Sequence, residues 1–301
     1  MGAAARSSRY LFGIACCCLA TLGWSLSGLF VRWVPELDGW GVNGYRAPAT
    51  AICLLIYLAL RYRGDLGRHL WPRQPRALFM VGAFFGIGST LYVYALTMGT
   101  VASVSVLGAT SPFFAAMLAW LIMREKASAV SLAATMIVLV GVAIVVQAEM
   151  SALATGFAAA LISLGYAFCF AGQTVWLRRY RDLEMIPGIA LGGLMVFAFV
   201  AIFVGLPTLP VWQIGLLALM GVVQLALPLI LFAEGAKHVP VVPAMLIALA
   251  DVVLNPFWAW LVHGEQPPSG TIAGGALIFS AIIGANLYEN RRQRIAAQQE
   301  V

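Results

Sequence analysis

The sequence predicts an all-α polytopic membrane protein, with ten transmembrane helices arranged as two inverted five-helix repeats. Of its 301 residues, 62% are hydrophobic and only 10% are charged, and the apolar residues gather in segments of membrane-spanning length. Soluble domains carry about 25% charged residues, and a helix needs about 20 apolar residues to cross a bilayer. The chain therefore has room for about ten crossings and little else.

The apolar segments account for almost the whole chain. They lie at about 10–31, 41–60, 77–97, 101–123, 129–147, 152–176, 186–206, 211–234, 240–262 and 270–288. The first follows Arg6 and Arg9, as the apolar region of a signal peptide would. It is too long for such a region, and further apolar segments follow it, so we expect it to be the first membrane helix.

The basic residues indicate an orientation. If the N-terminus is cytoplasmic, every Lys and Arg except Arg32 and Arg46 lies in or beside a cytoplasmic loop. Membrane proteins show this bias when the number and direction of their spans are assigned correctly. We therefore expect both termini to be cytoplasmic, in a multi-pass protein of the bacterial inner membrane. The net charge of +6 then reflects topology and does not indicate a nucleic-acid partner.

The two halves share a motif near the end of their fourth helix. A shift of 140 residues places Ala-Trp-Leu at 119–121 and Glu125 on the same pattern at 259–261 and Glu265. Five helices per half is an odd number, so the second half must enter the membrane from the opposite face. Such inverted repeats commonly place a solute site near the bilayer midplane.

These features divide the chain into three parts. We expect a first five-helix repeat at 1–149, a second at 150–288, and a cytoplasmic basic tail at 289–301.

With this repeat organisation, the chain resembles the EamA-like ten-helix permeases of the drug/metabolite transporter superfamily. The resemblance rests on the two five-helix halves and on Gly23-Trp24, Arg46, Pro112 followed by Glu125, and Asp251 followed by Glu265. It implies alternating-access transport through a central cavity lined by helices one to four and six to nine, with helices five and ten peripheral. Export of small metabolites, amino acids or amphipathic compounds is the commonest activity in such proteins. The family often has a proline directly after the acidic residue, whereas here the next proline is Pro256.

Asp251 lies near the middle of an apolar segment, where a charge costs about 2.5 kcal/mol or more. Asn255 and Trp258 follow it at helical spacing and share its face. Such a carboxylate can bind a cationic group of a solute or a coupling proton. The alternative is a fixed ion pair or a hydrogen-bonded contact between helices.

Arg46 is the other ionisable residue within a span. Its guanidinium could bind a substrate carboxylate with two parallel hydrogen bonds. It could also pair with Asp251, or extend to the nearby membrane surface. The sequence leaves these three alternatives open.

Aromatic and small polar residues complete the candidate site. Trp24, Tyr92 and Tyr166 together are expected to wall a cavity, although each singly fits ordinary helix packing. The 140-residue shift sets Ser111 against Asp251, so the halves differ chemically at that depth. We therefore expect Asp251 to serve the solute or its coupling. Pro112 and Pro256 are candidate hinges, with simple kinks as the alternative.

The remaining residues favour transport over other functions. The three histidines are far apart, and three consecutive cysteines at 16–18 point about 100° from one another, which predicts neither a metal site nor a cofactor. Without a catalytic constellation we do not expect an enzyme, and without a Walker-type glycine loop the driving force should be an ion or solute gradient. The expected partners are a small-molecule substrate, the lipid bilayer and, as a candidate coupling ion, the proton. No nucleic acid is expected, and the protein should be a monomer or weak dimer. A passive channel is the main alternative, and an intramembrane lipid-processing enzyme is less favoured.

Overall fold

The computed structural model describes residues 3–63, 67, 75–123, 129–180, 184–235, 237–239, 247–248 and 250–299, and all regular structure within them is helical. The first half contains α1 (Ala3–Trp24), α2 (Ser27–Arg32), α3 (Gly39–Arg61), α5 (Pro75–Met98), α6 (Val101–Gly108), α7 (Ser111–Met123) and α8 (Ala129–Ala152). The second half contains α9 (Gly156–Arg179), α10 (Met185–Phe199), η1 (Val200–Val204), α11 (Val211–Leu219), η2 (Met220–Ala226), α12 (Leu227–Gly235), α14 (Asp251–His263) and α15 (Ser269–Gln299).

Among the described residues, seven helical segments are long and apolar enough to cross a membrane by themselves. They are Tyr10–Arg32, Pro75–Met98, Val101–Ile122, Ala133–Ala152, Gly156–Trp176, Ile186–Val204 and Val211–Gly235. The helical class and the multi-pass character are therefore confirmed, whereas the number of ten spans is not.

The first apolar segment is not the single helix that its composition predicts. It divides at Ser25 and Leu26 into α1 and α2. The Ser25 hydroxyl donates to the carbonyl oxygen of Leu22 at 2.8 Å. Serine hydroxyls compete in this way with the backbone hydrogen bonds of a helix, which explains why apolar composition alone missed the interruption.

The fourth apolar segment is interrupted as well. Helix α6 ends at Gly108, and α7 begins at Ser111 after one turn in which Thr110 Oγ1 donates to the Leu107 carbonyl oxygen at 2.6 Å. Pro112 is the second residue of α7. Proline lacks a backbone N–H and is favoured in a first helical turn, so Pro112 marks the start of a new helix and not a kink within one.

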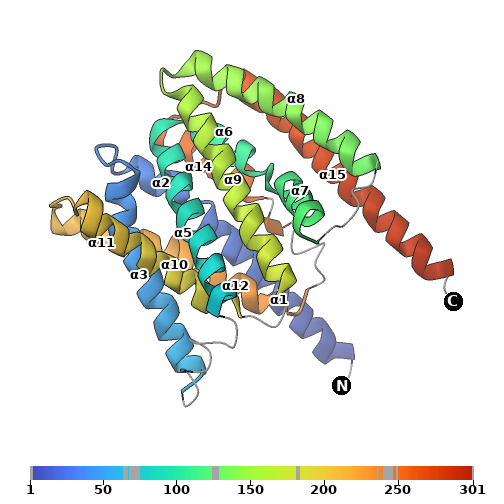
Figure 1. Cartoon of the computed structure of the whole chain (residues 1–301), viewed down its shortest axis with the longest axis horizontal. Coiled ribbons are helices and arrows are strands. Elements are labelled where there is room, and N and C mark those ends of the chain that lie inside the picture. Colours follow the sequence, from blue (N-terminus) through green and yellow to red (C-terminus); the bar gives the residue numbers. More distant parts are fainter. Residues whose placement is uncertain are drawn as a thin grey trace.

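The helices of the two halves interleave. Helix α5 packs along α9 and α10, and, in the corresponding arrangement, α12 packs along α1 while α11 and η2 pack along α3. Helices α8 and α15 pack mainly on each other and lie side by side along one edge of the molecule (Figure 1). The peripheral position expected for helices five and ten is thus observed.

Glycines bring α5 and α10 into backbone contact. A Cβ atom placed on Gly192 would lie 2.4 Å from the Gly82 carbonyl oxygen, and one on Gly86 would lie 3.0 Å from the Gly192 carbonyl oxygen. Small residues at such spacing let membrane helices approach closely and gain dispersion energy without a hydrophobic driving force.

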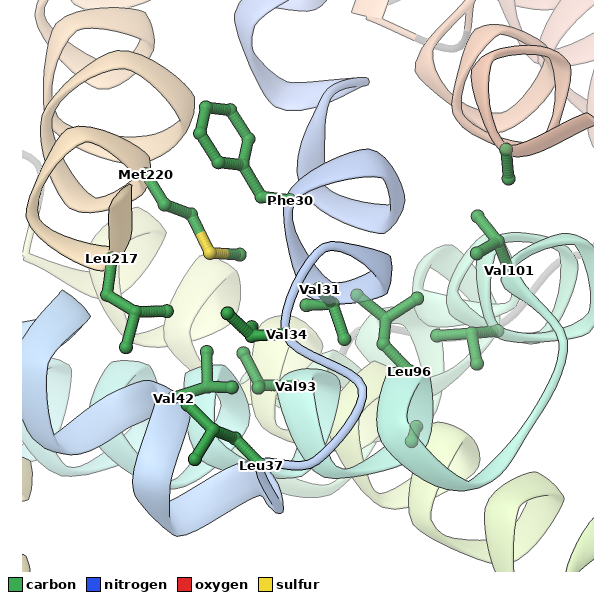
Figure 2. Close-up of a cluster of buried hydrophobic side chains, with 13 residues drawn as sticks. Phe30, Val31, Val34, Leu37, Val42, Val93, Leu96, Val101, Leu217 and Met220 are labelled. Atoms are coloured by element: carbon green, nitrogen blue, oxygen red, sulfur yellow. The ribbon is translucent and has the colours of Figure 1, made fainter. Parts of the chain in front are cut away.

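An apolar core fills the space between α2, α3, α5, α6, α11, η2 and α14 (Figure 2). Its buried residues are Phe30, Val31, Val34, Leu37, Val42, Val93, Ala95, Leu96, Val101, Val104, Leu217, Met220 and Ala259. Tyr92 is half-buried and packs against this core, so the core adjoins the polar residues described next.

Candidate functional site

Two tyrosines link Arg46 and Asp251, the two ionisable residues that the sequence predicts within spans. The rings of Tyr92 on α5 and Tyr166 on α9 are 4.8 Å apart, centroid to centroid. Each phenol interacts electrostatically with both the Arg46 guanidinium and the Asp251 carboxylate. The structure therefore brings four of the predicted site residues into one cluster, drawn from α3, α5, α9 and α14.

Arg46 is buried on α3, with only 2% of its surface exposed. Its Nη1 donates to Asn43 Oδ1 at 3.3 Å, while its Nε has no hydrogen-bond partner among the described residues. Extension to the membrane surface is thereby excluded for this conformation. The ion pairs that the structure describes join other residues, so Arg46 and Asp251 are not in direct contact.

Asp251 is the first residue of α14, as Ser111 is the first residue of α7. The 140-residue shift therefore relates two helix starts. Asp251 Oδ1 is buried and lacks a hydrogen-bond partner within the part of the chain that the structure describes. A helix N-terminus favours a negative charge, which offsets part of the cost of burying this carboxylate.

Asn255 lies one turn further along α14 and is completely buried. Its Oδ1 accepts from the Gly28 backbone N–H at 3.0 Å, and its Nδ2 donates to Ser27 Oγ at 2.9 Å, Tyr92 Oη at 3.0 Å and Ser105 Oγ at 3.2 Å. The Ser27 and Tyr92 hydroxyls are also hydrogen-bonded to each other. Asn255 thus joins α14 to α2, α5 and α6, and its hydrogen-bonding groups are already occupied.

The two predicted tryptophans lie beside the interruption of the first span. Trp258 Nε1 donates to Ser25 Oγ at 3.0 Å, and the Trp24 ring packs against Phe232 with centroids 5.2 Å apart. The Trp24 carbonyl oxygen faces Gln224 Nε2 at 3.5 Å. These contacts hold α1 to α12, η2 and α14. Pro256 lies inside α14, and its predicted role as a hinge stays a prediction.

Sequence reasoning missed Gln224 on the π-helical segment η2. Its side chain is 3% exposed, and its Oε1 has no partner among the described residues. A glutamine within an apolar span is a recognisable signal, because buried amides normally pair all their polar atoms.

Glu149 was also missed, because the predicted fifth span ends just before it. It is fully buried at the end of α8 and accepts hydrogen bonds from Thr100 N at 2.5 Å, from Thr100 Oγ1 at 2.9 Å and from Ser103 Oγ. It thereby caps the N-terminus of α6, where a carboxylate is favoured by the helix dipole. Its partners lie more than forty residues away in sequence, which explains why no local pattern revealed it.

Glu265 holds the same end of α6 from the second half of the chain. Its Oε2 pairs with Arg32 Nε at 2.7 Å, and its Oε1 accepts from Val101 N at 2.6 Å. Arg32 also donates to the carbonyl oxygens of Leu96 and Gly99, at 2.6 and 2.7 Å. Glu125, which corresponds to Glu265 in the first repeat, lies outside the described residues.

Apolar helices of membrane-spanning length that surround buried ionisable groups, close to interrupted helices, define a multi-pass membrane protein of the solute-transporter class. The comparisons with known proteins agree. The EamA-like transporter family model matches twice, at residues 11–147 and 154–287. The chain belongs to this family, within the drug/metabolite transporter superfamily.

Individual relatives include an exporter. The chain is 30% identical over 238 residues, covering 76% of this chain and 80% of the relative, to the Pseudopaline exporter CntI of Pseudomonas aeruginosa, in strains UCBPP-PA14 and PAO1. It is 25% identical over 130 residues to Solute carrier family 35 member G1 of Mus musculus, covering 43% of this chain and 34% of that protein. A protein of known crystal structure matches 94% of this chain and 98% of its own with a TM-score of 0.62 and 18% identity, which shows a shared fold.

Proposed function

We propose that this protein is a secondary active transporter that exports a small metabolite, such as an amino acid or another amphipathic organic solute. Alternating access around a central midplane site is the proposed mechanism. The observation that supports this proposal is the cluster of Arg46, Asp251, Tyr92 and Tyr166. In it, Arg46 Nε and Asp251 Oδ1 are buried and have no hydrogen-bond partner among the described residues. Unpaired buried charges are costly, and a solute that carries the opposite charges would offset that cost.

The proposed topology has ten spans in two inverted repeats, 1–149 and 150–288, with both termini and the basic tail 289–301 cytoplasmic. The corresponding helix contacts in the two halves and the common starting position of α7 and α14 support this arrangement. In this orientation the apolar core lies on the periplasmic side of Arg46, since Val42 precedes Arg46 by one turn of α3. A site closed on that side and loaded from the cytoplasm is what an exporter requires.

The proton is the proposed coupling ion, and Asp251 its proposed carrier. A carboxylate that binds a proton in one conformation and the solute's cationic group in another can link the two fluxes. The relative named for pseudopaline makes that compound a reasonable first member of a solute screen, together with amino acids, amines and organic acids.

Flux measurements in proteoliposomes test this function. Asp251→Asn should abolish proton-driven accumulation of a solute found in the screen while leaving solute exchange partly intact, and Thr174→Val, at an exposed position on α9, should behave as the wild type. The same pH dependence in the wild type and Asp251→Asn would contradict the coupling role. Saturable counterflow would support a transporter, whereas single-channel currents would indicate a passive channel. Turnover of lipid would indicate an enzyme.

A further inference from the structure

Asn43 is placed beside Arg46 in a way that leaves a second hydrogen-bond donor unused. It lies three residues before Arg46 on α3 and is 1% exposed. Its Oδ1 accepts from Arg46 Nη1 at 3.3 Å. A guanidinium can only donate, so this contact fixes the orientation of the amide and directs Nδ2 away from the pair.

Two buried donors therefore lie one helical turn apart without partners. Asn43 Nδ2 and Arg46 Nε are both inaccessible to water and form no hydrogen bond with any residue that the structure describes. Leaving a buried donor unpaired costs about 1–3 kcal/mol, and more when it is charged. Buried polar groups normally have hydrogen-bond partners, and a solute that accepts from both donors would supply them.

The surroundings restrict what that ligand can be. The phenols of Tyr92 and Tyr166, which carry no charge, interact electrostatically with Arg46, and its positive charge lacks an ion-pair partner among the described residues. An acceptor with negative charge is therefore favoured. Guanidinium and amide N–H groups together match a planar carboxylate, whose two oxygens accept from two donors at once.

We infer that Asn43 and Arg46 form a carboxylate subsite, in which Asn43 Nδ2 and Arg46 Nε each donate to one oxygen of the solute's carboxylate. This inference rests on the proposed transport function and deepens it, because it assigns the anionic group of the solute to α3. Asn43 then determines specificity: a solute without a carboxylate leaves both donors unpaired. Sites built to hydrogen-bond a particular group discriminate strongly against analogues that lack it.

Formate, a bare carboxylate, probes this subsite without knowledge of the solute. Purified full-length protein in detergent is unfolded thermally in rising sodium formate, with sodium chloride at matched ionic strength as the reference. Formate should raise the unfolding temperature of the wild type beyond chloride, as a ligand of the folded state does. Asn43→Leu should lower the fitted formate affinity about tenfold or more, the effect of losing one charge-assisted hydrogen bond. Ser163→Ala removes a buried hydroxyl that donates to the Ala159 carbonyl oxygen of its own helix, and it should leave the formate affinity unchanged.

A double-mutant cycle separates direct binding from an indirect effect on Arg46. If Asn43 donates to the anion itself, Asn43→Leu still weakens formate binding in an Arg46→Lys background, which keeps the charge. If Asn43 only positions Arg46, Asn43→Leu does not change the formate affinity in the Arg46→Lys background, and the inference is wrong. Equal stabilisation of the wild type by formate and chloride, or an unchanged formate affinity in Asn43→Leu, would also overturn it. A negative formate result would contradict the carboxylate subsite without affecting the flux experiments that test transport. The two proposals can therefore fail independently.

Discussion

Asn255 on α14 accepts a 3.0 Å hydrogen bond from the backbone N–H of Gly28, just beyond the interruption between α1 and α2. A single amide from the second half of the chain thereby satisfies a donor that the broken helix leaves free. The same side chain donates to hydroxyls on α2, α5 and α6. Asn255 therefore fixes the shape of the site without offering it a free polar atom.

Replacing Asn255 should destabilise the fold. We expect Asn255→Leu to lower the free energy of unfolding by about 2–4 kcal/mol, because Gly28 N and several hydroxyls lose a buried partner together. Thermal unfolding in detergent measures the effect, with Thr174→Val as the control because its exposed hydroxyl donates to the Phe170 carbonyl oxygen of its own helix. Similar unfolding temperatures for the two variants would contradict this role.

Two glycines of the same span should respond to alanine in opposite directions. A Cβ on Gly221 in η2 would lie 2.4 Å from the Arg46 carbonyl oxygen, whereas one on Gly215 in α11 meets nothing within 4 Å. Gly221→Ala should cost about 1–3 kcal/mol of stability by forcing α3 and η2 apart. Gly215→Ala should stabilise the helix by up to about 1 kcal/mol. Thermal unfolding of the two variants side by side checks the sign, and a stabilised Gly221→Ala would refute the close contact.

The Arg32–Glu265 ion pair should contribute measurably to stability. Its side chains are 23% and 18% exposed, and both also bind backbone groups of α5 or α6. A double-mutant cycle of Arg32→Gln and Glu265→Gln should give a coupling of about 1–3 kcal/mol. The more exposed Lys237–Glu234 pair, at 46% and 33%, serves as the comparison and should give less than about 1 kcal/mol. Equal couplings would argue against a special role for Arg32.

Glu149 should act as a hydrogen-bond acceptor more than as a charge. Glu149→Gln retains one oxygen for Thr100 N, and the Thr100 and Ser103 hydroxyls can rotate to accept from the new amide, so we expect a loss of about 1 kcal/mol. Glu149→Ala leaves these groups unpaired and should cost about 2–4 kcal/mol. Chemical or thermal unfolding distinguishes the two variants. If Gln were as damaging as Ala, the negative charge itself would be essential.

The sequence was sufficient for the helical class and the multi-pass character, because both depend on composition and segment length. The position of Arg46 and Asp251 within spans stays a prediction, because α3 and α14 are not among the seven segments long and apolar enough to cross a membrane. The sequence did not predict the breaks at Ser25 and Thr110, where hydroxyl groups replace backbone hydrogen bonds without any change in hydropathy. Pro112 was a visible signal of the second break, and its role as a hinge stays a prediction.

The site was predictable in its members and not in their partners. Helical spacing grouped Asn255 with Asp251 correctly on α14, but only the tertiary structure shows that Asn255 is occupied by α2, α5 and α6 while Asp251 Oδ1 is left open. Glu149 and Gln224 depend on residues far away in the chain for their environment, and a single sequence carries no record of such pairs.

The backbone contact between Gly82 and Gly192 joins the first family match to the second. During synthesis α5 is completed roughly a hundred residues before α10. The glycine face of α5 therefore has no packing partner during that interval. We therefore expect the first repeat to reach its stable form only when the second repeat is present. Two separately produced halves would then be expected to gain resistance to proteolysis on being combined.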